Sequence, residues 1–220
     1  MPSIRKQLPN LSAYGEPLLE HLLTGSEAAS RQIAYELCVS HHSLTGVFDE
    51  VMIPVLKQLS FLSAAGRIEE YEAERAKTYL LAIISEVRST VFVDVDAETA
   101  FGATSEGDRD FCSNQLAELA LRHEGLNASS LGTSLSAASM CRAIEQLRPS
   151  IFWITVSEVN REAELLAVIR SVSTLIAKHG KRLLLCGPGL ERFDLSKYQF
   201  AATQICSTYE SLIRAAKTVR

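Results

Sequence analysis

The sequence predicts an α/β protein with an N-terminal all-α part, in which a four-helix bundle precedes a doubly wound sheet of five parallel strands. Two observations predict this class. Apolar residues before Val93 recur at helical spacings of three and four, whereas from Thr99 onward short apolar runs alternate with helical stretches. Residues 94–98 follow neither pattern and read as a linker. The predicted domains are therefore residues 1–93 and 99–220.

Helical periodicity organises the first predicted domain. Four helices with short connections favour an antiparallel bundle. The expected helices cover Pro17–Leu23, a stretch after the N-cap Ser26, a stretch from Leu44 to about Ala64, and Glu69–Val91. Pro54 lies inside the third helix and predicts a kink there. Gly66 is expected to end that helix in the left-handed conformation.

The second predicted domain alternates between strands and helices. The expected strands are Ala100–Thr104, Ala128–Leu131, Ile151–Val156, Leu183–Cys186 and Phe200–Cys206. The expected helices are Phe111–His123, Ser136–Leu147, Glu162–Lys178 and Thr208–Thr218. Strict alternation predicts a parallel, Rossmann-like sheet with right-handed crossovers. Trp153, in the most hydrophobic strand, is expected to pack between sheet and helices. Ser207 and Glu210 are expected to form a capping box for the last helix.

Ligands of such a sheet bind at the carboxyl ends of its strands. The loops expected there are Ser105–Asp110, Gly132–Ser134, Thr155–Ser157 and Gly187–Gly189. Small residues dominate the last three, which suits close approach of a ligand and suits tight strand-to-helix turns equally well. The sequence has no dinucleotide fingerprint, phosphate-loop lysine, nucleophile elbow or H-E-x-x-H pattern. Nicotinamide and nucleoside triphosphate chemistry are therefore not expected.

Composition and charge exclude further classes. The net charge is -4 and the isoelectric point about 5.8, so no direct contact with nucleic acid is expected. No apolar run approaches the roughly 18 residues of a membrane span, and no secretory signal is visible, so a cytoplasmic location is expected. The five cysteines lack C-x-x-C spacing and are expected to be reduced thiols. The adjacent pair His41–His42 is expected to be a polar helix end rather than a metal site.

The layout resembles the cobalamin-binding domain family of methionine synthase type, whose members pair a four-helix cap with a Rossmann-like domain. The resemblance covers about Leu18–Ala216. Phe48–Leu56, with its internal proline, is similar to the third cap helix, and Gly66–Ile68 to the turn that follows. Leu147–Pro149 before an apolar strand is similar to the approach to the third strand. Relatives include stand-alone corrinoid proteins and the effector halves of transcription regulators that sense light or cobalamin.

The resemblance implies a cofactor motif, D-x-H-x-x-G, after the first strand, and the motif's histidine coordinates cobalt. Aligned on Gly107, this sequence reads Asp108 to Ser113, with Asp110 at the histidine position and Ser113 at the glycine position. Imidazole suits transition metals, whereas a carboxylate suits harder cations. Ligation of cobalt by a histidine of this chain is therefore not expected.

The resemblance implies further site positions in both domains. The family's S-x-L motif and paired glycine correspond to the third and fourth loops, and the residues over the corrin's upper face fall on the cap. The candidate cofactor-binding residues are Asp108, Asp110, Ser113, Thr155, Ser157, Gly187 and Gly189, with Ser63 and Glu74 in the cap.

Two hypotheses about the ligand of this site stay open. Either cobalamin binds base-on, keeping its own nucleotide on cobalt, or the pocket has changed to another ligand or to none. The bulky residues Arg109 and Phe111 favour the second.

These considerations favour a non-catalytic sensory or regulatory module that acts through a protein partner or a homo-oligomer. Only about 15 residues precede the first expected helix, too few for the DNA-binding helix-turn-helix of the family's regulators. The alternative is a corrinoid carrier that binds cobalamin base-on for a methyltransferase or mutase partner. A third hypothesis, an unrelated enzyme on the same fold, rests on Asp108, Arg109 and Asp110, which could equally cap a helix.

Overall fold

The computed structural model describes residues 10–39, 43–159, 161–192 and 197–217. Contacts between residues divide the chain into two compact units, Met1–Ile83 and Ile84–Arg220. The predicted linker lies in the second unit, and the domain boundaries drawn from the sequence stay predictions. Within the described ranges, no helix is long and apolar enough to cross a membrane.

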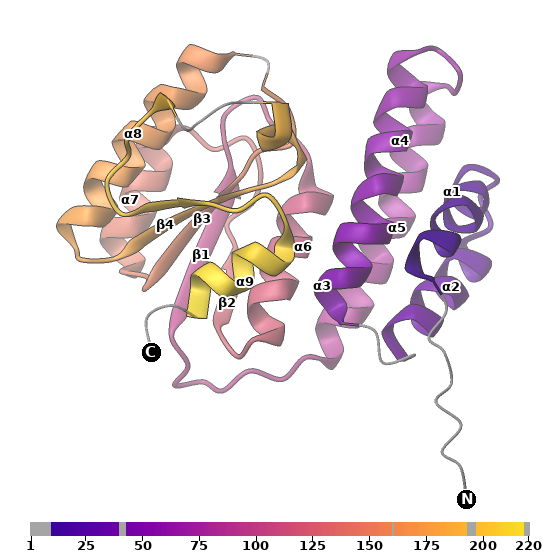
Figure 1. Cartoon of the computed structure of the whole chain (residues 1–220), viewed down its shortest axis with the longest axis horizontal. Coiled ribbons are helices and arrows are strands. Elements are labelled where there is room, and N and C mark those ends of the chain that lie inside the picture. The colour runs from indigo at the N-terminus through magenta and orange to yellow at the C-terminus, as the bar shows by residue number, and fades with distance from the viewer. Residues whose placement is uncertain (1–9, 40–42, 160, 193–196, 218–220) are drawn as a thin grey trace, which may run out of the picture. The chain divides into compact units, whose positions relative to one another are not determined.

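The first unit consists of helices in its described part (Figure 1). Its elements are a 3₁₀ turn at Leu11–Tyr14 (η1), α1 at Gly15–Leu23, α2 at Glu27–Val39, α3 at Leu44–Val47, a π-helical turn at Phe48–Met52 (η2), α4 at Ile53–Ala64, and the greater part of α5, Glu70–Thr90. Helix α1 packs against α2 and α4. Leu18, Leu22, Leu37 and Leu80 are fully buried, as the helical spacing predicted for a bundle.

The third predicted helix is divided into α3, η2 and α4. Pro54 stands at the start of α4, directly after the π-helical turn. A proline ring clashes with the carbonyl four residues earlier, and a widened turn relieves that clash. The third helix is thus interrupted by a π-helical turn directly before Pro54, and the predicted kink itself stays a prediction. Gly66 has a φ of +64°, and the Arg67 amide donates to the Leu62 carbonyl at 2.9 Å, so the left-handed helix end is confirmed.

The second unit is a five-stranded parallel sheet flanked by helices (Figure 1). The strands are β1 (Thr99–Thr104), β2 (Asn127–Ser130), β3 (Ile151–Thr155), β4 (Arg182–Cys186) and β5 (Thr203–Ile205). The helices are α6 (Phe111–His123), α7 (Ala137–Leu147), α8 (Glu162–Lys178) and α9 (Tyr209–Lys217), with a 3₁₀ turn at Pro188–Arg192 (η3). The strand order is β2-β1-β3-β4-β5, so the predicted doubly wound sheet is confirmed. Its order reverses between β1 and β3.

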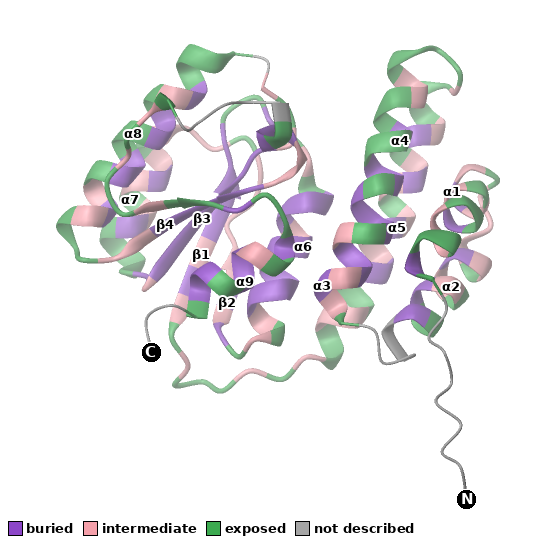
Figure 2. Cartoon of the chain, in the orientation of Figure 1, coloured by how far each residue is buried: buried purple, intermediate pink, exposed green. Residues whose placement is uncertain are grey.

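Helices cover both faces of this sheet, α6 and α9 on one and α7 and α8 on the other. Every residue of β3 is buried, as the purple ribbon in Figure 2 shows, because a central parallel strand has no solvent face. Phe152 and Ile154 pack with α7 and α8, whereas Trp153, paired with Gly102 of β1, points to the α6 face. The expected packing of Trp153 between sheet and helix is confirmed.

The capping box predicted for the last helix is wrong by one residue. The Thr208 hydroxyl accepts a hydrogen bond from the Ser211 amide, and the Ser211 hydroxyl accepts one from the Thr208 amide, both at 3.0 Å. Glu210 forms an ion pair with Arg214 at 3.1 Å, so its side chain does not reach back to Ser207. A serine replaces the glutamate of the usual capping pair.

This cap predicts unequal effects for two neighbouring substitutions. Thr208→Ala removes the acceptor of the Ser211 amide, and it should lower the free energy of unfolding by about 1 kcal/mol. Ser207→Ala is the control, since Ser207 is exposed, and it should change stability by less than about 0.5 kcal/mol. Urea denaturation of the two variants measures both values. Equal losses would show that the cap is not Thr208.

Candidate functional site

The predicted site residues of the second unit meet at the carboxyl edge of the sheet, around the reversal of strand order. The loop after β1 carries Asp108 and Asp110, the loop after β3 carries Ser157, and the loop after β4 carries Gly187 and Gly189. Ser113 lies in the first turn of α6, and Thr155 ends β3. Parallel strands bring these loops together because their carboxyl ends share one edge.

Ser63 and Glu74 lie in the first unit. The backbone carbonyl of Ser63, in the last turn of α4, accepts the Gly66 amide at 3.0 Å. Glu74 is exposed on α5, and its carboxylate pairs with Lys77 at 2.7 Å. Both residues therefore have local roles in their own helices, and their contribution to a cofactor site stays a prediction.

Asp108 connects three loops of the carboxyl edge. Its side chain is buried, and one oxygen, Oδ2, accepts the Ser157 amide at 2.8 Å. The other oxygen, Oδ1, accepts the Ser157 hydroxyl and the Asp110 amide, the latter at 3.0 Å. The backbone carbonyl of Asp108 accepts the Thr104 hydroxyl at 2.5 Å and the Ser134 amide at 3.0 Å. Asp108 thus joins the loops after β1, β2 and β3.

The charge of Asp108 is poorly solvated at this place. Burial raises the pKa of its carboxyl above the ordinary value of 3.8, although the hydrogen bonds from Ser157 and from the Asp110 amide act in the opposite direction. The nearby charge of Asp110 raises this pKa further. The carboxylate therefore stabilises the folded protein through the hydrogen bonds that it accepts, whereas the burial of its charge destabilises the folded protein.

Asp110, which the resemblance aligns with the family's cobalt-binding histidine, caps α6. Its Oδ1 accepts the Ser113 amide at 3.2 Å, and its Oδ2 accepts the Ser113 hydroxyl at 2.5 Å. The residue is in the extended conformation usual for an N-cap. The two motif positions at which this sequence departs from the resemblance therefore bond to each other.

A second polar network lies between α6 and the sheet. It centres on Asn114, which was not among the residues predicted from the sequence. Its amide oxygen accepts the Trp153 Nε1–H at 2.8 Å and the Thr155 hydroxyl at 3.2 Å. Its amide nitrogen donates to the Ser130 hydroxyl at 2.6 Å and to the Gly132 carbonyl at 3.1 Å. Every polar atom of this buried amide is satisfied from within the protein, as burial requires.

Trp153 fills the space between β1 and α6. Its side chain has no exposed surface. A Cβ on Gly102, the neighbour of Trp153 across the sheet, would lie 2.0 Å from Trp153 Cδ2. The glycine in β1 is therefore required by the indole ring, and the ring occupies this part of the sheet face.

Gly187 and Gly189, after β4, are explained by contacts with the loop after β3. A Cβ on Gly187, whose φ is +112°, would lie 2.4 Å from the Val156 carbonyl oxygen. A Cβ on Gly189 would lie 2.8 Å from the carbonyl carbon of Ser157. The Gly189 amide donates to the Val156 carbonyl at 2.9 Å. Close approach of the chain to itself accounts for these glycines, which favours the tight-turn alternative over contact with a ligand.

The histidines of the second unit lie away from this edge. His123 ends α6 and His179 follows α8, and helices that cross over between parallel strands end near the opposite edge of the sheet. His41–His42 falls outside the described residues. Among the residues that the structure describes, no cluster of three or more His, Cys, Asp or Glu could hold a metal ion.

Comparison with known proteins agrees with this fold. No family model and no curated protein match the sequence. Among solved structures, the monomethylamine corrinoid protein of Methanosarcina barkeri is 10% identical with a TM-score of 0.69, over 96% of this chain and 100% of that one. A methanol:cobalamin methyltransferase complex of the same organism is 15% identical with a TM-score of 0.47, over 96% and 83%. A cobalamin-binding protein of Desulfitobacterium hafniense is 11% identical with a TM-score of 0.45, over 94% and 97%.

The class that these findings define is a helical bundle with a Rossmann-like parallel sheet. More particularly, the fold is like that of the monomethylamine corrinoid protein, which agrees with the fold that the resemblance predicted. At 10% identity the likeness concerns the fold alone.

The residues at the carboxyl edge do not fit cobalamin bound through a protein histidine. The histidine position holds a carboxylate that is engaged in a helix cap, and Asp108 is engaged by Ser157. None of the buried polar side-chain atoms without a partner in the described chain belongs to this edge. The buried polar side chains of the edge, Asp108 and Ser113, are therefore satisfied within the protein.

Proposed function

We propose that this chain is a non-catalytic regulatory module that acts through a protein partner and in which the corrinoid-type edge has become a structural element. One observation carries the proposal. Asp108 bonds to Ser157 and to the Asp110 amide, and Asp110 bonds to Ser113, so the motif that would ligate cobalt joins loops and caps a helix instead.

Two further properties support this proposal. The carboxylates on which an enzyme hypothesis would rest, Asp108 and Asp110, accept hydrogen bonds from backbone amides and neighbouring hydroxyls, and they are held in structural roles. The net charge of -4 disfavours nucleic acid as the partner, since duplex binding uses a basic face. A protein partner or a second copy of the chain is therefore the expected target.

The proposal is tested with cobalamin itself. The purified chain is mixed with methyl-, adenosyl- and hydroxocobalamin in the dark and desalted, and its visible spectrum is recorded. We expect a colourless protein, because Asp110, at the position aligned with the cobalt-binding histidine, is a carboxylate held in a helix cap, and Asp108 is bonded to Ser157. The Asp110→His variant should also stay colourless, since the variant restores the histidine but not the glycine of the motif, at whose position Ser113 stands.

The other outcomes separate the alternatives. A stoichiometric spectrum with the nucleotide base displaced from cobalt would overturn the proposal, because it would show that the chain binds the cofactor and holds its nucleotide away from cobalt, as a corrinoid carrier would. A stoichiometric base-on spectrum would support the corrinoid carrier or a cobalamin sensor. Size-exclusion chromatography with light scattering then shows whether the partner of a colourless protein is a second copy of the chain.

A further inference from the structure

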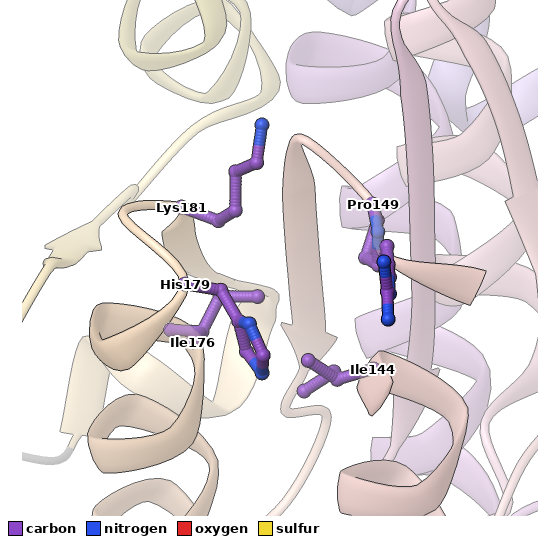
Figure 3. Close-up of a pocket in the computed structure, with 6 residues that line it drawn as sticks. Ile144, Pro149, Ile176, His179 and Lys181 are labelled. Carbon is purple, nitrogen blue, oxygen red and sulfur yellow. The ribbon is translucent and has the colours of Figure 1, made fainter. Parts of the chain in front are cut away.

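A hollow of about 350 Å³ lies at the opposite, amino edge of the sheet, away from the candidate site. It opens between the C-terminal ends of α7 and α8, beside the segments that enter β3 and β4 (Figure 3). Figure 3 shows Ile176 and His179 facing Ile144 across the gap, with Pro149 on the α7 side and Lys181 at one end. The lining residues are Ile144, Arg148, Pro149, Ile176, His179 and Lys181.

The lining combines an apolar floor with basic groups. Ile144, Ile176 and Pro149 are buried. Arg148 and Lys181 are cations, and the imidazole of His179 carries at least one N–H donor. No carboxylate belongs to the lining, and none of these basic side chains forms an ion pair with the described residues. The hollow therefore offers positive charge and donors over an apolar surface.

The backbone holds two of the basic residues in fixed positions. Arg148 follows α7 with a φ of +48°, and its amide donates to the Ile144 carbonyl at 3.0 Å. The left-handed conformation is usually left to glycine, because other residues adopt it at a cost. Lys181 is placed by a second left-handed turn at Gly180, and its amide donates to the Ile176 carbonyl at 3.1 Å.

Basic residues near helix ends have a simpler explanation, since they offset the negative end of the helix dipole. That explanation accounts for one cation at each helix end. It does not account for the meeting of cations from two helix ends around an apolar hollow, or for an arginine at a position suited to glycine.

We propose that this hollow binds a small organic anion, a carboxylate or phosphate ester that carries an apolar group. Ligand pockets combine an apolar lining with a few polar groups, and this volume falls at the small end of their usual range of roughly 300–1,000 Å³. The guanidinium of Arg148 can bind two oxygens of a carboxylate or phosphate, and Lys181 adds a point charge. The apolar group would lie against Ile144 and Ile176. This site is separate from the carboxyl edge and goes beyond the proposed function.

The test measures binding of phenyl phosphate to the full chain by isothermal titration calorimetry. We expect saturable binding, and binding of inorganic phosphate weaker by about fivefold, because the phenyl group adds apolar burial. The double variant Arg148→Gly/Lys181→Gln should weaken binding of phenyl phosphate by at least about tenfold, since charged hydrogen bonds contribute roughly 1.5–3 kcal/mol. Glycine suits the backbone at position 148, so this variant should stay folded.

The matched control is Arg142→Gln, which removes an exposed cation of α7 outside the lining and should leave the affinity unchanged. Circular dichroism confirms that each variant is folded. Absence of saturable binding to the wild-type chain would overturn the proposal, and so would equal affinity in the double variant. Stronger binding of hexanoate or benzoate than of phenyl phosphate would identify the anion as a carboxylate. Since cobalamin plays no part in this experiment, its outcome is independent of the proposed function.

Discussion

Replacing Gly102 with alanine should lower the free energy of unfolding by about 3 kcal/mol, at the upper end of the usual cost of overpacking a core. The added Cβ would lie 2.0 Å from Trp153 Cδ2 and 2.2 Å from Cε2. The indole ring is fully buried, and its Nε1–H donates to Asn114, so it cannot move aside without breaking that bond. Gly102 is itself buried in β1, which is paired with a strand on each side, so the backbone also has little freedom to shift.

Urea denaturation followed by circular dichroism measures this loss. The double variant Gly102→Ala/Trp153→Leu provides the control, because the smaller side chain removes the atoms that the new methyl group would meet. We expect its loss of stability to be smaller than the sum of the two single losses by about 1 kcal/mol or more. If Gly102→Ala cannot be isolated, recovery of the folded double variant still tests the contact. Additive losses would show that Gly102 and Trp153 are not coupled.

The pairing of Gly102 with Trp153 shows what the sequence can and cannot predict. The run around Trp153 is apolar without interruption, which predicts a buried parallel strand and a packing role for the indole ring. Which residue faces that ring depends on the register between β1 and β3. Register is a tertiary property, so the need for glycine at position 102 became visible only in the fold.

The candidate site was predictable in its position but not in its chemistry. Alternation of strands and helices places Asp108, Ser157 and Gly187 at one edge of the sheet, and the structure agrees. The sequence left open whether small loop residues receive a ligand or form tight turns. The distance from Gly187 to the Val156 carbonyl favours the turn, and no local pattern encodes that distance.

Asn114 was missed for a related reason. It lies four residues before Glu118 on α6, and both side chains are buried in a helix whose other buried residues are mostly apolar. Two polar residues in that register were a usable signal, because buried polar side chains require partners. Their partners, Trp153 and Ser130, come from two separate strands and could not be identified without the sheet order.

Replacing Asp108 with alanine should lower the free energy of unfolding by about 3 kcal/mol. The substitution leaves the half-buried Ser157 and Asp110 amides without their acceptor, and each should cost at the lower end of the roughly 1–3 kcal/mol of a buried donor that loses its partner. It also removes the connection between the loops after β1 and β3. Glu106→Gln, an exposed change in the same loop, is the control and should be nearly neutral. A loss for Asp108→Ala no larger than that of the control would mean that the loops after β1 and β3 hold together without this side chain.

The pH dependence of the same site separates its hydrogen bonds from its charge. Burial raises the pKa of Asp108 in the folded protein above its ordinary value of 3.8, so the folded state binds a proton more tightly than the unfolded chain. The stability due to this group is therefore full below pH 3.8 and is lost as the pH rises through the folded pKa. Asp108→Asn lacks this titration. The unfolding free energy of the wild type minus that of Asp108→Asn should consequently be larger at about pH 4 than at about pH 7, because only the wild type loses stability between these values. Urea denaturation at both values measures this difference. A difference that grows with pH would show that the carboxylate charge stabilises the fold, the reverse of what its burial implies.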